Sequence, residues 1–171
     1  DFDGADDTFT LTQYGDAPAA DIRNDDATSN YLRLLHGVGN QQNVAAFDRT
    51  APGSYGRITA AFDFRLDPGA DGMGFALLNT GDYGVAGAGP SLGAWEEPNL
   101  ARSFGAGFDI YDDIHDVSLH WNSEVKDSVS SSFDYRTGST GDFNRAEISV
   151  DFVHDGAYVS LSVGGTAVYT D

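Results

Sequence analysis

The sequence contains no cysteine, and among its 171 residues it has one methionine and one lysine. The absence of cysteine excludes disulfide bonds and thiolate chemistry, so the redox compartment stays open. No run of apolar residues approaches the roughly 20 that a membrane-spanning helix needs, so we expect no membrane insertion. No window of about a dozen residues carries the apolar stripe of an amphipathic helix, which argues against a helical fold.

Basic residues are also scarce: 9 Lys and Arg residues face 27 Asp and Glu residues, and the formal net charge is −18. A surface this negative repels phosphate backbones and anionic lipids, so we expect no nucleic-acid partner. Glutamate occurs at only four positions, which leaves 27 − 4 = 23 aspartates. Aspartate is a turn residue, a poor helix former and a ligand of hard cations. This composition favours a loop-rich β protein, although adaptation to salty water accounts equally well for the overall charge.

Short segments in which apolar and polar residues alternate are frequent. Residues 58–66 and 145–153 show this period of two, which is typical of strands buried on one face. The HDG turn at 154–156 leads into another alternating segment at 157–163, so we predict a β-hairpin. Further strands are expected at 8–11, 31–35, 44–47, 72–78, 103–111, 117–121 and, after the GG turn at 164–165, at 166–170. Many short strands separated by Gly and Asp predict an all-β fold, an antiparallel β-sandwich or jelly roll, with residues 1–171 as a single domain.

An acidic cluster lies in the segment FDIYDDIHDVSLHWN (108–122), between two predicted strands. Its members are Asp109, Asp112, Asp113 and Asp116. Carboxylates held this close raise one another's pKa values and strain the fold. A Ca²⁺ ion would remove the repulsion, since it takes about 6–8 oxygen ligands, carboxylates and carbonyls included. An Asp-rich hairpin loop solvated by water is the alternative, and the spacing does not match an EF-hand.

Three motifs in order resemble the legume-type (L-type) lectins of the concanavalin A-like superfamily. They are ADGMGFALL (70–78), GAGPSLG (87–93) and SFGAGFDIYDD…DVSLHW (103–121). The resemblance covers residues 70–121 and implies a concanavalin A-like jelly roll, in a bacterial module that is secreted or displayed at the cell surface. Members of the family continue for one or two strands past the point where this sequence ends. The final strand or strands are therefore expected to be absent or to be shared with another chain.

The same resemblance implies one calcium site. Its ligands would be the carboxylates of Asp109, Asp113 and Asp116 and the backbone carbonyl of Tyr111. Gly107 stands where plant members have a metal-binding Glu, so no second metal site is expected. Without that Glu, His120 is interpreted as a surface or groove residue.

The implied sugar site involves Asp71 as an acceptor of sugar hydroxyls and Gly89 as a backbone N–H donor. Asp113 stands in place of the family's Asn and would contact both ion and sugar. The long irregular loop at 79–102 adds Trp95, whose ring is suited either to stacking on a sugar or to packing that holds the loop in place.

These interpretations predict a calcium-dependent carbohydrate-binding module for a neutral glycan, and not an enzyme. Glucanases of this fold carry a Glu-x-Asp-x-(x)-Glu strand, which four isolated glutamates do not provide, and no GxSxG motif is present. A glycoside hydrolase is therefore the least favoured function. The main alternative is a calcium-stabilised structural or adhesive module of an extracellular assembly, present as a homo-oligomer or sharing a strand with a neighbour.

Overall fold

A computed structural model of the chain describes most of its residues. The described residues are 2, 8–16, 18–24, 30–39, 41–49, 51–69, 71–92, 97–138 and 141–170. Chain contacts divide the protein into two units: the N-terminal unit, Asp1–Pro52 with Leu78–Ser91, and the C-terminal unit, Gly53–Leu77 with Leu92–Asp171. In the described part the regular structure consists of strands, apart from the short helix α1 (Thr80–Tyr83) and a single 3₁₀ turn at Tyr111–Asp113. The prediction of an all-β fold with antiparallel sheets is confirmed.

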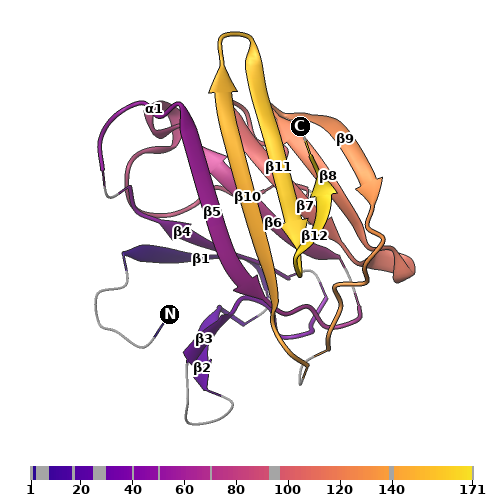
Figure 1. Cartoon of the computed structure of the whole chain (residues 1–171). Coiled ribbons are helices and arrows are strands. Elements are labelled where there is room, and N and C mark those ends of the chain that lie inside the picture. Colours follow the sequence, from indigo (N-terminus) through magenta and orange to yellow (C-terminus); the bar gives the residue numbers. More distant parts are fainter. Residues whose placement is uncertain are drawn as a thin grey trace. The chain divides into compact units, whose positions relative to one another are not determined.

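The C-terminal unit contains two four-stranded sheets (Figure 1). The first has the order β12-β11-β10-β5, and its strands are β5 (Arg57–Phe64), β10 (Asn144–Val153), β11 (Gly156–Val163) and β12 (Thr166–Tyr169). The second has the order β6-β7-β8-β9, and its strands are β6 (Gly72–Leu78), β7 (Ser103–Asp109), β8 (Asp116–Trp121) and β9 (Glu124–Ser130). The predicted β10–β11 hairpin is confirmed, with Val153 opposite Gly156.

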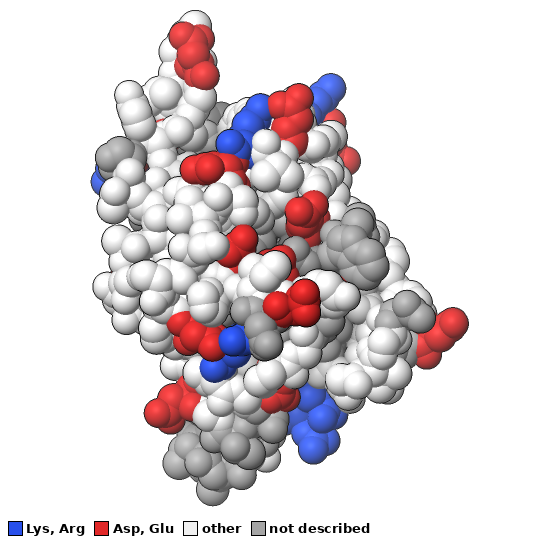
Figure 2. Space-filling model, turned by 90° about the vertical axis from the view of Figure 1, so that its right-hand side faces the viewer, with Lys and Arg blue, Asp and Glu red and all other residues white. Residues whose placement is uncertain are grey.

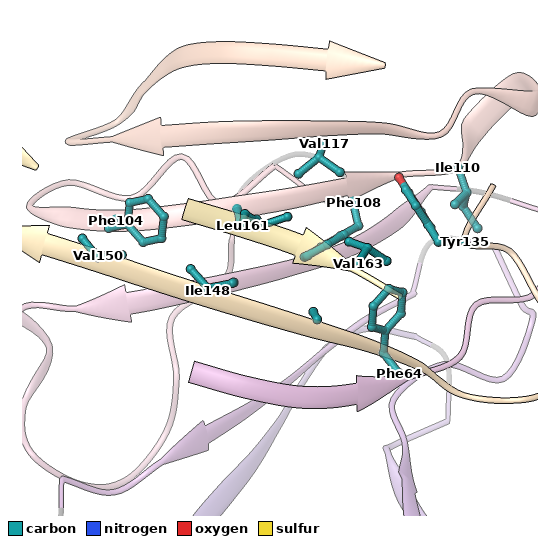
Figure 3. Close-up of a cluster of buried hydrophobic side chains, with 12 residues drawn as sticks. Phe64, Phe104, Phe108, Ile110, Val117, Tyr135, Ile148, Val150, Leu161 and Val163 are labelled. Carbon is teal, nitrogen blue, oxygen red and sulfur yellow. The ribbon is translucent and has the colours of Figure 1, made fainter. Parts of the chain in front are cut away.

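The inward faces of these two sheets form the core of the C-terminal unit (Figure 3). Phe108 and Val150 are fully buried, as their positions in the alternating pattern predict. Phe64 of the first sheet meets Phe108 of the second with ring centroids 5.3 Å apart. Phe62 stacks on Phe75 at 5.5 Å in the same way. Side chains from both sheets therefore interdigitate in one sandwich-like core, which places the polar faces of the sheets outward.

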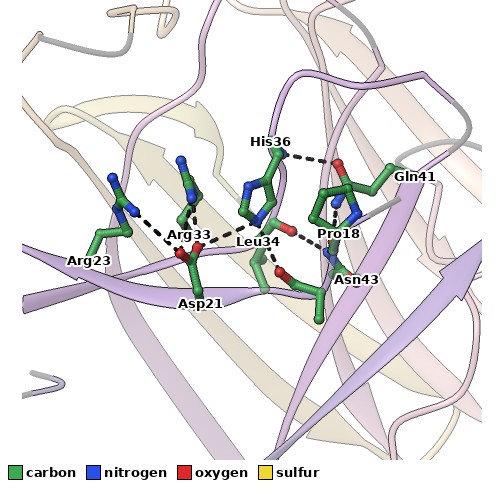
Figure 4. A network of polar contacts seen from close by, with 9 residues as sticks. Pro18, Asp21, Arg23, Arg33, Leu34, His36, Gln41 and Asn43 are labelled. Atoms are coloured by element: carbon green, nitrogen blue, oxygen red, sulfur yellow. Dashed lines mark hydrogen bonds and ion pairs between the residues drawn. The ribbon is translucent and has the colours of Figure 1, made fainter. Parts of the chain in front are cut away.

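The N-terminal unit has two strand pairs: β1 (Phe9–Gly15) with β4 (Gln41–Phe47), and β2 (Asp21–Asn24) with β3 (Asn30–Arg33). A polar network anchors the second pair (Figure 4). The Asp21 carboxylate accepts two hydrogen bonds from Arg33, at 2.9 and 3.0 Å. These bonds hold the pKa of the Asp21 carboxyl below its usual range. Asn43 donates to the carbonyls of Pro18 and Leu34, which ties the segments around this pair to β4.

Two strands were not predicted, and both are largely exposed. In β9, six of the seven residues are exposed, so no buried face imposes an alternating pattern on the sequence EVKDSVS. Its place in the sheet comes from the β8–β9 turn, where Asn122 and Ser123 adopt φ values of 52° and 68°. Positive φ at both turn residues gives the twist that a two-residue hairpin needs. The strand β2 is similarly exposed at three of four residues.

Acidic side chains outnumber basic ones across the face shown in Figure 2. Most of the described arginines lie in ion pairs, for example Arg57 with Asp151 and Arg136 with Asp134. The excess of carboxylates is therefore largely uncompensated at the surface. No helix in the described ranges is long and apolar enough to cross a membrane.

Candidate functional site

The acidic loop connects β7 to β8 on the outward face of the second sheet. Phe108 is buried in the core and pairs with Val117, so the next residues outward, Asp109 and Asp116, lie at facing strand ends on the opposite face. The Tyr111 N–H donates to the Asp109 carboxylate at 2.8 Å and tightens the first turn of the loop. Asp112 follows at φ 52°, in the left-handed region that Asp and Asn tolerate best.

Tyr135 holds the two ends of this loop together. Its side chain is fully buried, and its hydroxyl lies 2.6 Å from the carbonyl oxygen of Asp109 and 2.7 Å from that of Asp116. One O–H group is thus shared between two carbonyls from different strands. The ring packs edge-on against Phe108 at 6.0 Å, which fixes the hydroxyl in position. The sequence offered no signal for this role, because Tyr135 is 26 and 19 residues from its partners.

Asp71 joins the site from the start of β6. The Ile110 N–H donates to the Asp71 carbonyl at 2.9 Å, which brings the beginning of β6 beside the end of β7. Partial burial raises the pKa of the Asp71 carboxyl, and the negative charge of Asp109 raises it further. The structure therefore brings Asp71 and Asp109 close enough for their charges to interact unfavourably.

Asp116 takes part in a separate contact. Its carboxylate accepts a hydrogen bond from the Ser130 hydroxyl on β9 at 2.7 Å. Among the side chains that the structure describes, no three from His, Asp and Glu gather closely enough to hold a metal ion. The side chain of Asp113, the central expected ligand, lies outside the described residues. The described oxygen donors near the loop include the carboxylates of Asp71 and Asp109 and the carbonyl of Tyr111. Oxygen donors of this kind suit Ca²⁺.

Gly89 and Trp95 are the other two residues expected to bind sugar. Gly89 belongs to the N-terminal unit, where it is buried against β4 and its carbonyl accepts a hydrogen bond from Tyr14 at 2.7 Å. A Cβ at this position would lie 2.6 Å from Cγ1 of Val44, so only glycine fits there. Trp95 lies outside the described residues.

The expectation that His120 lies at the surface or in a groove is wrong. His120 is 1% exposed. Its Nδ1 lies 2.7 Å from Oδ1 of Asn99, and its Nε2 lies 2.7 Å from the Ser118 hydroxyl. Both ring nitrogens are therefore engaged, and neither is free to bind a metal. Burial lowers the pKa of the imidazole, although the charge of Glu97 opposes the shift.

The lack of a side chain at Gly105 on β7 explains why His120 is buried. A Cβ at Gly105 would lie 2.4 Å from Cγ of Pro98, so the absence of a side chain lets the segment at 97–102 approach the sheet. Gly105 pairs with His120, and the same segment therefore covers the imidazole. The group that approaches the sheet at Gly105 is therefore the protein's own loop.

Comparisons with known proteins identify no relative: no protein-family model, no curated protein and no solved structure matches this chain. The resemblance of residues 70–121 to the L-type lectins remains a prediction.

Proposed function

We propose that this chain is a calcium-dependent carbohydrate-binding module of concanavalin A-like jelly-roll architecture, secreted or displayed at the cell surface. One Ca²⁺ ion would order the loop at 109–116 and with it a surface that receives a neutral glycan. The observation that carries the proposal is the juxtaposition of Asp71 and Asp109 beside a loop whose ends Tyr135 clamps together. Such a placement of like charges is unfavourable unless a cation offsets it.

The ion would be held by the carboxylates of Asp109, Asp113 and Asp116 and by the carbonyl of Tyr111. The Tyr111 carbonyl accepts one hydrogen bond from the Ile114 N–H, and its second lone pair is suited to a cation. When bound, Ca²⁺ supplies positive charge that stabilises the ionised carboxylates and orders the turn. Asp71 is suited to accept hydrogen bonds from sugar hydroxyls, because its carboxyl is partly desolvated.

Calorimetric titration of the whole chain with CaCl₂ tests the cation, with MgCl₂ as the comparison. We expect Ca²⁺ binding and a rise in the melting temperature, both abolished in Asp109→Asn. Asp155→Asn is the matched control, since Asp155 is exposed in the β10–β11 turn and its replacement removes the same charge. Equal melting temperatures in CaCl₂ and in EGTA for the unmodified chain would refute the cation site.

A polysaccharide pull-down and glycan array, each run in CaCl₂ and in EGTA, test the sugar. We expect binding in CaCl₂ that is lost in EGTA and in Asp71→Asn. Calcium-dependent melting without glycan binding would instead assign the alternative role of a structural or adhesive module.

A further inference from the structure

Four polar side chains form a hydrogen-bonded relay beside the acidic loop: Glu97, Asn99, His120 and Ser118. The Asn99 amide nitrogen donates to Oε2 of Glu97 at 3.0 Å. The Asn99 amide oxygen lies 2.7 Å from Nδ1 of His120, and Nε2 of His120 lies 2.7 Å from the Ser118 hydroxyl. The relay therefore runs from a carboxylate to a serine through an amide and an imidazole.

The carboxylate at one end sets the direction of every hydrogen bond in this relay. An ionised Glu97 only accepts, so the Asn99 NH₂ group must face it and the amide oxygen must face His120. That oxygen also only accepts, so Nδ1 of His120 carries the proton. Burial lowers the pKa of the imidazole and so favours the neutral ring, in which Nε2 has a free lone pair. The Ser118 hydroxyl is consequently the donor to Nε2, which is the arrangement that activates a serine nucleophile.

The relay is held by a rigid segment. Pro98 packs on Gly105, and the carbonyl of Leu100 accepts hydrogen bonds from the Ser103 hydroxyl at 2.7 Å and from the Ser123 N–H at 3.0 Å. These contacts anchor the segment to both β7 and the β8–β9 turn. Asn99 and His120 are therefore already in position before a ligand binds.

Ser118 is less buried than His120. It pairs with Gly107 on β7, which is buried, and with Ser128 on β9. Ser118 is half-buried, whereas Ser128 is exposed. Side chains directly opposite each other in a ladder have Cβ atoms about 5 Å apart, so the Ser128 hydroxyl is within reach of an oxygen bound at Ser118.

We propose that Ser118 is a nucleophile toward short-chain acyl esters, with His120 as its general base and Ser128 as a hydrogen-bond donor to the developing oxyanion. Asn99 and Glu97 are positioning residues that set the tautomer of His120. A short acyl group is proposed because Ser118 is only half exposed, so a bulky substrate would not reach its hydroxyl. This activity does not depend on calcium or on sugar binding.

The step balances with water as the only co-reactant. Ser118 Oγ attacks the carbonyl carbon of the ester while its proton moves to Nε2 of His120. The bond to the alkoxy group then breaks, and that group leaves with the proton from Nε2 as an alcohol. Water adds to the acyl-serine, giving its proton to Nε2, and the carboxylic acid leaves as Ser118 regains a proton.

A fluorophosphonate probe and p-nitrophenyl acetate test the nucleophile on the full chain. We expect the probe to modify Ser118, as mapped by peptide mass spectrometry, and acetate release to exceed the buffer rate by at least tenfold. Ser118→Ala removes both signals, whereas Ser160→Ala, which removes a hydroxyl from the outward face of the other sheet, leaves both unchanged. Circular dichroism of each variant verifies that it folds.

The roles of Asn99 and Glu97 have a spectroscopic readout that packing alone would not produce. The ¹⁵N shifts of His120 should report a neutral ring protonated at Nδ1, and Asn99→Ala should give a mixture of tautomers with at least tenfold slower labelling. The proposal is overturned if the folded chain is not labelled at Ser118, if labelling spreads equally over exposed serines, or if acetate release survives in Ser118→Ala.

Discussion

Removing the hydroxyl of Tyr135 should loosen the acidic loop without disturbing the core. Tyr135→Phe keeps the ring, which packs against Phe108 at 6.0 Å and Phe64 at 6.1 Å. It deletes the shared hydrogen bond to the carbonyls of Asp109 and Asp116. The change therefore isolates the clamp from the hydrophobic burial of the side chain.

The loss of stability follows from two carbonyl acceptors that both lose the same buried donor, the Tyr135 hydroxyl. Each buried carbonyl left without its partner costs about 1–3 kcal/mol at most, and a shared hydrogen bond is weaker than two separate ones. We therefore expect a loss of about 2 kcal/mol in the free energy of unfolding. For a chain of this length that loss corresponds to a fall in melting temperature of roughly 4–8 °C.

Urea denaturation and thermal melting measure this change. Tyr169→Phe provides a graded comparison, since the Tyr169 hydroxyl donates to one carbonyl, that of Val117, at 2.8 Å. Tyr158→Phe is the control, because Tyr158 is 57% exposed. If Tyr135→Phe is no more destabilising than Tyr158→Phe, the Tyr135 hydroxyl does not clamp the loop.

Two further predictions concern other contacts of the C-terminal unit. Gly105→Ala should destabilise the fold by about 1–3 kcal/mol, because the new methyl group overlaps Pro98, whereas Gly156→Ala meets no atom within 4 Å and should have a much smaller effect in the same urea titration. Asp134 should make the fold sensitive to acid: hydrogen bonds from Arg136 lower the pKa of its carboxyl from 3.8 to about 2. Its folded-state pKa is depressed, so the stabilisation is present above pH 3.8 and is lost as the pH falls through 2. Melting temperatures at pH 5 and pH 2 should therefore differ less in Asp134→Asn than in the unmodified chain, and equal differences would contradict the assignment.

Strand positions were predictable where one face is buried. Burial forces apolar residues to every second position, and this pattern located β5 at residues 58–66 and β10 at 145–153. The strand β9 could not be found in this way, because both of its faces are largely exposed and its pairing depends on the turn that joins it to β8.

The candidate site was predictable only in part. The acidic cluster was visible because its members are close in the sequence, whereas Asp71 entered the predicted site through the resemblance alone. Tyr135 and Asn99 were not found, because each acts through a partner at least 19 residues away. His120 was misjudged because its exposure depends on a segment that packs over it from another part of the chain.

The sequence by itself determined the β class, the inward faces of the main strands and the local density of negative charge. Each of these depends on residue type and on the period of two along a strand. Only the tertiary structure decided which carbonyls Tyr135 joins and that Asn99 meets Nδ1 of His120. Those contacts arise when loops fold back over a sheet, and the spacing of residues within a strand does not encode them.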